Sequence, residues 1–578
     1  MEDARLAESV RQKLEEHIPR AEWTEEERCW YKEEKKRQKE LEKAAKKQSK
    51  SEESSITCSD VVAAATLMHT LRVDESSPAF ARYDVAALTR ANDADSSRRL
   101  WVEVGALDAA HPACANAEEV WLRGRVHTIR PQGSKVAFVV LRHQYATVQI
   151  VFAADSETGV SREMVRWLVR SGEVTPESVV DICGAVVPAQ VKSCTQREVE
   201  IRAKRLYVVS KAQVPLPFEV EDAGRRPEEE GPHVHRDTRL DHRFMDLRVP
   251  AHQAIIRLQS GVSTLFREWL VRNGFTEIHT PKIISGTSEG GAEVFRLKFF
   301  EEDACLAQSP QLYKQMAICG DMRRVFEVGP VFRAEKSNTY RHLTEFISMD
   351  IEMEIQESYH EILDVLERLF LYIFEGLEQR YREELACVQR QYPFRPLGYR
   401  RDQWLRLSHR EAIEMLREHG LEMSDLSDFT SEQEKTLGEI IRKRYETDFY
   451  VIDRYPADCR PFYTMPAADD PRYSNAFDIF MRGEEIVSGA QRIHDVELLT
   501  RRALHKGINL ETVAELFGSF PIRRVSARWR WYRPRTRCDA LSRYWERSRM
   551  CDIPPRSQTL ASLTPPSKKG DEGSVSRM

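Results

Sequence analysis

The sequence predicts a multi-domain protein in which a small five-stranded β-barrel precedes a larger α+β domain built on an antiparallel sheet. The chain has 578 residues, of which 41% are hydrophobic, so it can form more than one core. Short segments rich in Val, Ile and aromatic residues fill residues 116–212, and strand-like runs mix with amphipathic helices after residue 249. These two patterns, taken in chain order, predict the fold class.

Composition and charge exclude several classes of protein. No run approaches the ~20 apolar residues that a membrane span needs, and the charged amino-terminal segment lacks the apolar core of a secretory signal. Eleven scattered cysteines without any C-x-x-C pair indicate neither a zinc ribbon nor a disulfide framework. We therefore expect a cytoplasmic protein without membrane contact.

Residues 1–55 are predicted to form a basic helical extension. Between residues 31 and 50, eight lysines recur at spacings of three and four, which places them on one face of a helix: Lys32, Lys35, Lys36, Lys39, Lys43, Lys46, Lys47 and Lys50. A helix with almost no apolar residues cannot bury itself, so it projects into solvent. Two interpretations stay open: a solvated charged tail, or an arm that binds a phosphate backbone.

Residues 56–115 are mixed in composition and are assigned only as a linker. From about Val120, five short segments that alternate apolar with polar residues, separated by turn signals such as Pro131-Gln132-Gly133, predict a small barrel over residues 116–212. The five-stranded OB-fold is one option for such a barrel. Residues 213–248 are polar, contain Pro and Gly, and are predicted to be a hinge.

Residues 249–520 are predicted to form the α+β domain. An amphipathic helix ends at Gly274, strand-like runs follow, and a long helical pattern begins near residue 357. Because helices and strands do not strictly alternate, the pattern favours an antiparallel sheet over a parallel one.

Polar segments interrupt this domain at positions that a purely structural strand would not need. They are Ser288–Gly291, Gln308–Gln315, Phe332–Phe346, Asp350–Glu352 and Gly483–Arg492. Taken singly, each Arg or Glu is typical of a surface residue or a structural ion pair. Together they supply what a nucleotide and an amino acid require, since arginine binds phosphate and carboxylate through a fork of donors and carboxylates bind ammonium or Mg²⁺.

The segment FRAEKSNTYRHLTEF closely resembles motif 2 of the class II aminoacyl-tRNA synthetases, and the helix followed by FTEIHTPKI resembles their motif 1. SEGG, AQSPQLYKQ and GEEIVSGAQRIHD resemble the aspartyl subgroup in its eukaryotic and archaeal form. The resemblance covers residues 116–520, with the motifs in the family's order. It implies an anticodon-binding OB-fold, a class II synthetase catalytic domain that dimerises through motif 1, and ligation of L-aspartate to tRNA(Asp) with ATP and Mg²⁺. The resemblance also suggests membership of a multi-synthetase assembly.

The resemblance implies a role for each matching residue of the catalytic domain. Arg333 is the catalytic arginine that holds the α-phosphate of ATP. The residues implied to bind ATP are Arg333, Glu335, Arg341, His342, Phe346 and Glu485. Those implied to bind aspartate are Glu289, Gln311, Lys314, Ser488 and Arg492, with Lys314 and Arg492 on its side-chain carboxylate. Glu485 and Ser488 are the implied metal ligands. Two cations suit a carboxylate, whereas a neutral amide would leave both without charge compensation.

In the barrel, the resemblance implies that Phe138 stacks on an anticodon base and that Gln149 and Glu200 read base edges. Stacking combined with hydrogen bonds to base edges is how unpaired RNA is commonly recognised. Without the resemblance, Phe138 would be interpreted as an ordinary strand aromatic.

Residues 521–578 depart from the family, because motif 3 and its phosphate-binding arginine are missing. The segment after Phe520 is rich in arginine, shows no apolar period, and is predicted to be a poor strand. Read one base later, the codons allowed by Pro521 to Asp539 are compatible with R-Y-G-A-(S/C)-P-H-G-G-(A/G)-G-I-G-L-E-R-V-(V/A)-M. Those of Ile553 to Leu560 are compatible with Y-P-R-D-P-K-R-L. We infer an out-of-frame tail caused by one inserted base near residue 520.

The sequence is therefore compatible with two functions. The first is an aspartate–tRNA ligase, impaired as written because motif 3 is missing. The second is a non-catalytic tRNA-binding or regulatory relative that keeps the barrel and the basic arm.

Overall fold

The computed structural model describes Thr24 and residues 80–82, 99–116, 118–156, 158–284, 294–334 and 343–507, and the backbone of residues 524–531. The basic arm, most of the linker, Glu289, Glu335, Arg341, His342 and the tail after residue 531 lie outside these ranges. The chain divides into two compact units, Met1–Val214 and Pro215–Met578, which are described separately below.

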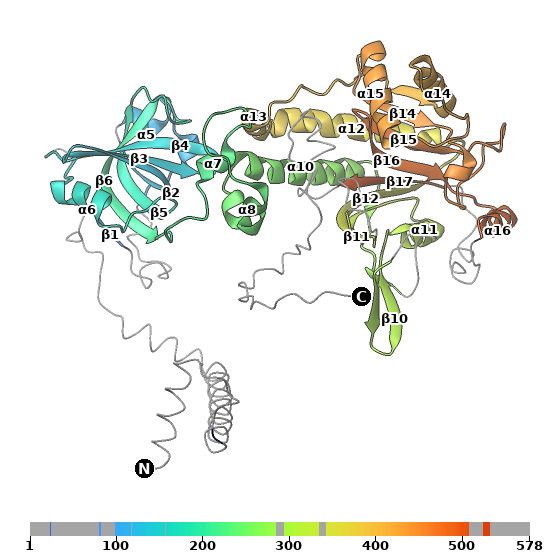
Figure 1. Cartoon of the computed structure of the whole chain (residues 1–578), viewed down its shortest axis with the longest axis horizontal. Coiled ribbons are helices and arrows are strands. Elements are labelled where there is room, and N and C mark those ends of the chain that lie inside the picture. Colours follow the sequence, from blue (N-terminus) through green and yellow to red (C-terminus); the bar gives the residue numbers. More distant parts are fainter. Residues whose placement is uncertain are drawn as a thin grey trace. The chain divides into compact units, whose positions relative to one another are not determined.

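The first unit is a closed five-stranded barrel, which confirms the predicted OB-fold (Figure 1). Its strands are β2 (Glu119–Gln132), β3 (Val136–His143), β4 (Ala146–Ala153), β5 (Val179–Pro188) and β6 (Val199–Ser210). They pair in the order β4-β3-β2-β5-β6, and β6 closes the barrel on β4 through a parallel pairing. The short strand β1 (Phe80–Arg82) adds to β6 in parallel.

Small helices complete this unit around a barrel filled by alternate side chains. They are η3 (Val104–Ala106), α5 (Pro112–Ala115) and α6 (Arg162–Arg170). The hydroxyl of Ser161 accepts a hydrogen bond from Met164 N at 3.1 Å and so caps the start of α6. Gly184 is required for closure, because a β-carbon there would lie 2.4 Å from the carbonyl oxygen of Arg202.

The second unit is built on an eight-stranded sheet, as the α+β prediction requires. In spatial order its strands are β13 (Leu405–Ser408), β14 (Phe449–Asp453), β15 (Ala476–Met481), β16 (Glu484–Gln491), β17 (Arg524–Trp531), β12 (Glu345–Glu354), β11 (Arg324–Phe332) and β7 (Thr276–Glu277). Adjacent strands are antiparallel except at the two edges, where β13 with β14 and β7 with β11 are parallel.

Two long helices, α10 (Pro250–Arg272) and α12 (His360–Arg380), cover one face of this sheet (Figure 1). The shorter helix α13 (Arg382–Gln391) packs against α10. The ring of Phe266 on α10 meets Phe326 of β11 edge-on at 5.9 Å, and Phe374 on α12 meets Phe449 of β14 edge-on at 5.1 Å. The apolar stripes of α10 and α12 therefore pack on the sheet, which leaves the opposite face for the polar side chains of the candidate site.

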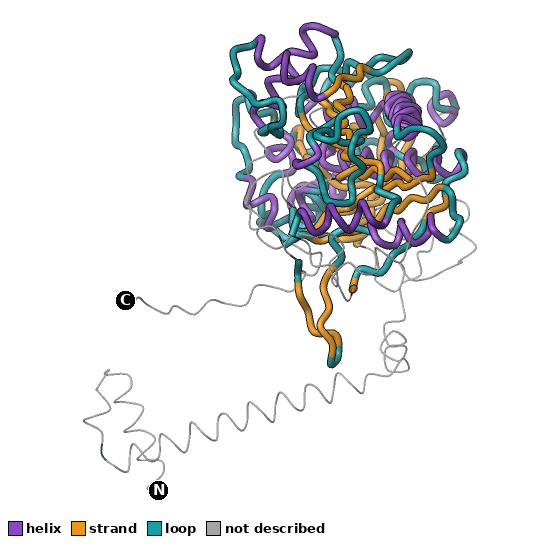
Figure 2. The backbone as a smooth tube through the Cα atoms, turned by 90° about the vertical axis from the view of Figure 1, so that its right-hand side faces the viewer, coloured by secondary structure: helices purple, strands orange, loops and turns teal. Residues whose placement is uncertain are grey.

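Shorter elements frame that opposite face. They are α11 (Gln311–Cys319), α14 (His409–Glu418), α15 (Ser431–Tyr445), η4 (Ala457–Cys459) and α16 (Val496–His505). A separate three-stranded sheet consists of β8 (Ile283–Ile284), β9 (Arg296–Phe299) and β10 (Glu302–Leu306), and Figure 2 shows β9 and β10 projecting from the rest of the unit as a hairpin. In the part of the chain that the structure describes, no helix is both long and apolar enough to cross a membrane.

One prediction is wrong: the segment after Phe520 was predicted to be a poor strand, but it contains β17. Its backbone instead pairs antiparallel with both β12 and β16. Two causes explain the difference. Backbone pairing between two open strand edges does not depend on side chains. The sequence RVSARWRW also alternates polar with apolar residues, a two-residue period that suits a strand and that a search for longer apolar runs overlooks.

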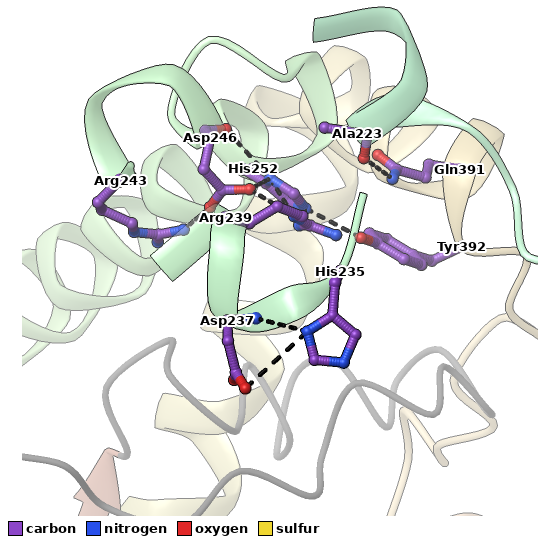
Figure 3. A network of polar contacts seen from close by, with 9 residues as sticks. All are labelled: Ala223, His235, Asp237, Arg239, Arg243, Asp246, His252, Gln391 and Tyr392. Carbon is purple, nitrogen blue, oxygen red and sulfur yellow. Dashed lines mark hydrogen bonds and ion pairs between the residues drawn. The ribbon is translucent and has the colours of Figure 1, made fainter. Parts of the chain in front are cut away.

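Residues 213–248, predicted as a hinge, contain α7 (Val220–Gly224), α8 (Arg236–Asp241) and α9 (Arg243–Asp246). A polar network ties them to α10 and α13 (Figure 3). Asp246, almost fully buried, accepts a hydrogen bond from Arg239 Nε at 2.7 Å and pairs with Arg243. Gln391 Nε2 at the end of α13 donates to the carbonyl oxygen of Ala223 at 3.0 Å.

His252 lies at the centre of this network. Its Nδ1 is 2.9 Å from Asp246 Oδ1, and its Nε2 is 2.6 Å from Arg239 Nη2 and 2.9 Å from the hydroxyl of Tyr392. Burial lowers the pKa of His252 well below its ordinary value, and the charges of Arg239 and Arg243 act in the same direction. A neutral ring that donates from Nδ1 and accepts at Nε2 satisfies these contacts.

Candidate active site

The predicted catalytic residues gather on the face of the sheet opposite α10 and α12. Strand register shows why: Asp350 of β12 is paired with residue 528 of β17, residue 528 with Ser488 of β16, and Ser488 with Asp478 of β15. Paired residues on adjacent strands project to the same side of a sheet. One row across four strands therefore carries Asp350, Ser488 and Asp478 on a common face.

A β-bulge in β16 brings Glu485 onto that face as well. Residues three apart on a regular strand point to opposite sides. Here Val487 pairs with Ile479 and Glu485 with the next residue, Phe480, so Ile486 is an extra residue in the ladder. The bulge restores the alternation and places Glu485 and Ser488 on one side, as the metal-binding role predicted for the two residues requires.

The two cations predicted to bind the substrate carboxylate converge on two buried acids. Lys314 of α11 is fully buried, and its Nζ lies 3.0 Å from Asp350 Oδ1 and 3.8 Å from Glu352 Oε2. Arg492 Nη2 lies 3.9 Å from the same Glu352 oxygen. Two buried cations beside two buried carboxylates form a site that suits a ligand carrying both a carboxylate and an ammonium group.

Neighbouring groups hold these charges in place. Ser348 donates its hydroxyl hydrogen to Asp350, and the guanidinium of Arg492 lies 4.4 Å from the ring centroid of Tyr463. Gln311, predicted to contact the substrate, is buried in the first turn of α11. Side chains fixed by packing in this way lose little freedom when a ligand arrives.

Arg333 and Phe346 lie at the end of the β11–β12 hairpin, where motif 2 was predicted. Arg333 N donates to the carbonyl oxygen of Thr344 at 2.9 Å, which extends the ladder beyond Phe332. The guanidinium of Arg333 lies 5.8 Å from the ring centroid of Phe346, and both side chains are largely buried. An arginine next to an aromatic ring matches the predicted contacts to a phosphate and to adenine.

A second arginine on this face was not predicted. Arg460 follows η4, and its two Nη atoms contact both carboxylate oxygens of Asp478, at 3.1 and 2.5 Å. Arg460 Nη1 also donates to Ser488 Oγ at 3.3 Å. Burial opposes the charge of Arg460, but the adjacent Asp478 outweighs it and raises the pKa of the guanidinium.

Aromatic groups enclose this second arginine. The guanidinium of Arg460 lies 3.8 Å from the ring centroid of Tyr455, and the ring of His409 lies 5.1 Å from the ring of Tyr455. Burial lowers the pKa of His409 to about 4, although its bond to the carbonyl of Ser427 and the nearby Asp478 and Asp425 act against this, while Arg460 acts with it. Burial also raises the pKa of Tyr455. Both residues are therefore neutral partners of the charged pair.

The geometry of this face bears on the predicted metal ligands, Glu485 and Ser488. Among the described residues, no group of three or more His, Cys, Asp or Glu side chains is arranged to hold a metal ion. Glu485 and Ser488 do share a face, and Asp478 adds a carboxylate beside Ser488. This oxygen donor set has the chemistry that Mg²⁺ prefers, although the guanidinium of Arg460 contacts two of its three members.

The predicted anticodon-binding residues lie together on the outer surface of the barrel. Gln149 pairs with Val140 of β3 and with Glu200 of β6 in the strand register, and Phe138 lies two residues from Val140 on the same side. All three predicted residues are half-buried, whereas the intervening positions fill the core. Gln149 Nε2 donates to Glu200 Oε2 at 2.9 Å. A ring beside two hydrogen-bonding groups suits an unstacked base.

The sequence interpretation missed four residues of this site, and one signal points to three of them. Asp350, Glu352 and Asp478 are carboxylates inside otherwise apolar strands, a pattern that costs free energy unless each is paired. Arg460 carries no such signal, because it lies in an irregular segment. The polar segment containing Asp350 and Glu352 was recognised, but no role was given to either residue.

Two protein-family models match this chain. Residues 235–522 match the family model for class II tRNA synthetases of the D, K and N type, and residues 120–209 match the model for the OB-fold nucleic acid binding domain.

The cytoplasmic aspartate–tRNA ligase of Homo sapiens is 50% identical over 410 residues, which cover 70% of this chain and 80% of the human protein. The cytoplasmic aspartate–tRNA ligase 2 of Arabidopsis thaliana is 48% identical over 412 residues, covering 70% and 73%. Among solved structures, the aspartyl-tRNA synthetase of Entamoeba histolytica superimposes with a TM-score of 0.70 at 41% identity, covering 79% of this chain and 91% of that one.

Proposed function

This chain belongs to the class II tRNA synthetases of the D, K and N type, and from that premise we propose the reaction that its site performs. It is an aspartate–tRNA ligase that activates L-aspartate with ATP and transfers the aspartyl group to tRNA(Asp). The relatives it matches are named as cytoplasmic enzymes, and it is assigned to the same compartment.

One observation carries the choice of aspartate. Lys314 and Arg492 both approach Glu352, at 3.8 and 3.9 Å, inside a buried region of the sheet face. A substrate carboxylate can pair with both cations there, whereas an amide would form no ion pair with either of them and a lysine side chain would add positive charge. The pocket therefore favours aspartate over asparagine and lysine.

Activation requires groups that hold ATP. Arg333 is suited to the α-phosphate and Phe346 to the adenine ring, and Glu485 and Ser488, with Asp478 beside them, are suited to Mg²⁺. A bound Mg²⁺ would neutralise phosphate charge during the transfer. Glu289, Glu335, Arg341 and His342 are assigned to the same substrates by resemblance alone. No side chain need act as a nucleophile, because positioning and charge neutralisation suffice for this reaction.

The tail is proposed to be out of frame, so the chain as written is impaired. The match to the family model ends at residue 522, next to the inferred insertion. The missing motif 3 arginine would neutralise ATP phosphates, and loss of one such group costs about 2.7–4 kcal/mol in the transition state. The tail also replaces the segment that should pair between β12 and β16.

The first test is ATP–pyrophosphate exchange. The full chain and a version with one base removed near codon 520 are compared with aspartate, asparagine or lysine as substrate. The frame-restored version should exchange with aspartate alone, and the chain as written should be far slower. Exchange that is equal in the two versions would refute the impairment, and exchange with asparagine would refute the substrate.

The second test concerns tRNA. The frame-restored protein should charge tRNA(Asp), and a parallel reaction with tRNA(Asn) determines whether that tRNA is accepted. Phe138, Gln149 and Glu200 are proposed to contact the anticodon. A homodimer through motif 1 and membership of a multi-synthetase assembly stay predictions, which sedimentation and co-purification would examine.

The truncated family match also favours a second candidate, a non-catalytic tRNA-binding relative. It shares the barrel surface and the basic arm but not the reaction. Genomic reads across codons 520 and 521 separate the two: an intact reading frame in the genome supports the ligase, whereas a real insertion supports the non-catalytic protein.

A further inference from the structure

The pair formed by Arg460 and Asp478 lies where the proposed metal ligands gather. Arg460 contacts both carboxylate oxygens of Asp478, at 3.1 and 2.5 Å, and Ser488 Oγ at 3.3 Å. Asp478 is paired with Ser488 in the strand register, and Glu485 reaches the same face through the bulge. A guanidinium thus contacts two of the three oxygen-bearing side chains at this position.

Packing holds Arg460 in this arrangement. Its side chain is 12% exposed and that of Asp478 is 6% exposed. One face of the guanidinium lies against the ring of Tyr455 at 3.8 Å. A planar donor that is stacked on an aromatic ring and bound through two nitrogens is fixed in orientation, unlike a surface ion pair. The pair is therefore part of the site and not a solvent-exposed contact.

The charge balance of this arrangement controls metal binding. A divalent cation is attracted by carboxylates, but Asp478 is already neutralised by Arg460, and a second cation beside Arg460 would be repelled in a poorly solvated region. Bound ATP reverses this charge balance, because its phosphates add negative charge that compensates the positive charge of Arg460. A guanidinium is also a good hydrogen-bond donor to phosphate, so Arg460 can exchange its carboxylate partner for a phosphate oxygen.

We propose that Arg460 is a positioning residue that occupies the cation position of the substrate-free site and couples entry of the divalent metal to ATP. The inference rests on the proposed function, since it takes ATP as the nucleotide. It predicts that metal and nucleotide bind cooperatively, each raising the affinity for the other by the same factor.

Mn²⁺ binding to the full chain, measured by electron paramagnetic resonance without nucleotide, tests the proposal. Arg460→Met should bind Mn²⁺ about tenfold more tightly than the unchanged protein, within the usual range of coupling between sites. Arg460→Lys, which keeps the charge, should fall between the two. The matched control is Arg454→Met, which breaks a more exposed arginine–aspartate pair with Asp469, 2.5 Å apart, and should leave Mn²⁺ affinity unchanged. Equal Mn²⁺ affinity in Arg460→Met and the unchanged protein would overturn the proposal.

A second variant keeps the test valid if Arg460→Met fails to fold, as judged by its melting curve. Asp478→Asn should weaken Mn²⁺ binding when a non-hydrolysable ATP analogue is bound but not in the nucleotide-free protein. The reason is that Arg460 is already paired with Asp478 when no nucleotide is bound. Equal weakening in both conditions would show that the metal reaches Asp478 freely and would refute the idea.

These results are separable from the proposed function. Mn²⁺ binding requires neither aspartate nor tRNA, so a failure of aspartate-dependent exchange leaves the Mn²⁺ result readable. Conversely, normal exchange together with an unchanged Mn²⁺ affinity in both variants removes only the role of Arg460.

Discussion

Lys314 illustrates how a charged residue is accommodated in a protein core. Its side chain is fully buried, and it relies on Asp350 at 3.0 Å and Glu352 at 3.8 Å for compensation. Such a group costs free energy unless its partners are fixed, which the row of acids on β12 provides. In the proposed function, a substrate carboxylate would join these two as a further partner of the amine.

The aspartate pocket leads to a prediction on substrate affinity. In the frame-restored protein, Lys314→Met or Arg492→Leu should raise the KM for aspartate at least about tenfold and leave the KM for ATP nearly unchanged. The reason is that a lost charged partner in a desolvated pocket costs a few kcal/mol, about 2–5. Pyrophosphate exchange at varied aspartate concentration measures this effect. A KM for aspartate that does not change would remove that residue from the pocket.

Two buried histidines predict how stability depends on pH. Burial lowers the pKa of His409 to about 4 and lowers that of His252 well below its ordinary value. Both rings stay neutral in the folded chain, whereas in the unfolded chain they take up protons below about pH 6.5. Their contribution to stability is therefore largest above pH 6.5 and falls as the pH falls towards the folded pKa values; for His409 the loss at pH 5.5 is about 1.4 kcal/mol.

Urea unfolding at pH 7.5 and pH 5.5 checks this pH dependence. His409→Gln keeps a donor for the carbonyl oxygen of Ser427, which His409 Nε2 contacts at 3.0 Å, but it cannot take up a proton. The variant should lose less stability than the unchanged protein between the two pH values. His419 is a suitable control because its ring is partly exposed, so His419→Gln should keep the original pH dependence.

At the scale of elements, the sequence predicted strands and helices well where periodicity is strong. The barrel strands were predicted because inward residues such as Val148 and Ile150 alternate with outward ones, and burial along β4 follows the same alternation. The sequence could not predict the bulge at Ile486, because a bulge depends on the register of the partner strand β15. Without it, no periodic rule places Glu485 and Ser488 on one face.

Arg460 and β17 show two other limits of sequence interpretation. Arg460 reaches the site from an irregular segment, and only the folded chain brings it to Asp478, 18 residues later. The strand β17 forms because two neighbouring strands, β12 and β16, provide unpaired backbone groups. Long-range pairing of this kind outweighs local preference and cannot be read from a short window of residues.

The network around Asp246 leads to a prediction on stability for the short helices α8 and α9. Asp246→Asn should destabilise the second unit by about 3–5 kcal/mol, because removal of one partner leaves the buried charge of Arg239 without compensation. Thermal or urea unfolding measures the loss. Asp237→Asn is the matched control: Asp237 is also drawn in Figure 3, but its side chain is 70% exposed and pairs only weakly with His235 at 3.9 Å.

That control should change stability by no more than about 0.5 kcal/mol. If both asparagine variants unfold at the same denaturant concentration as the unchanged protein, the network does not hold α8 and α9 in place. The segment would then behave as the flexible hinge that its polar composition predicts.

The whole molecule carries the proposed anticodon surface on one unit and the proposed catalytic face on the other, so a bound tRNA is expected to contact both. Contacts at Phe138, Gln149 and Glu200 are proposed to provide recognition, but three residues give little general affinity. The lysines of residues 31–50, which lie outside the described residues, are the strongest candidate for a non-specific phosphate contact. In the helix that the sequence predicts, their spacing would place eight positive charges along one face, with no apolar stripe for docking on the protein.

We therefore predict that the arm raises tRNA affinity without adding sequence specificity. Deleting residues 1–50 should weaken tRNA binding and reduce the slope of log affinity against log salt concentration, because fewer counterions are released. The ratio of cognate to non-cognate affinity should stay constant, since the anticodon residues remain. Replacing the eight lysines with glutamine separates charge from helix formation, as glutamine keeps a similar helix propensity. If the truncated and substituted chains bind tRNA with the original affinity and slope at low salt, the segment is only a solvated tail.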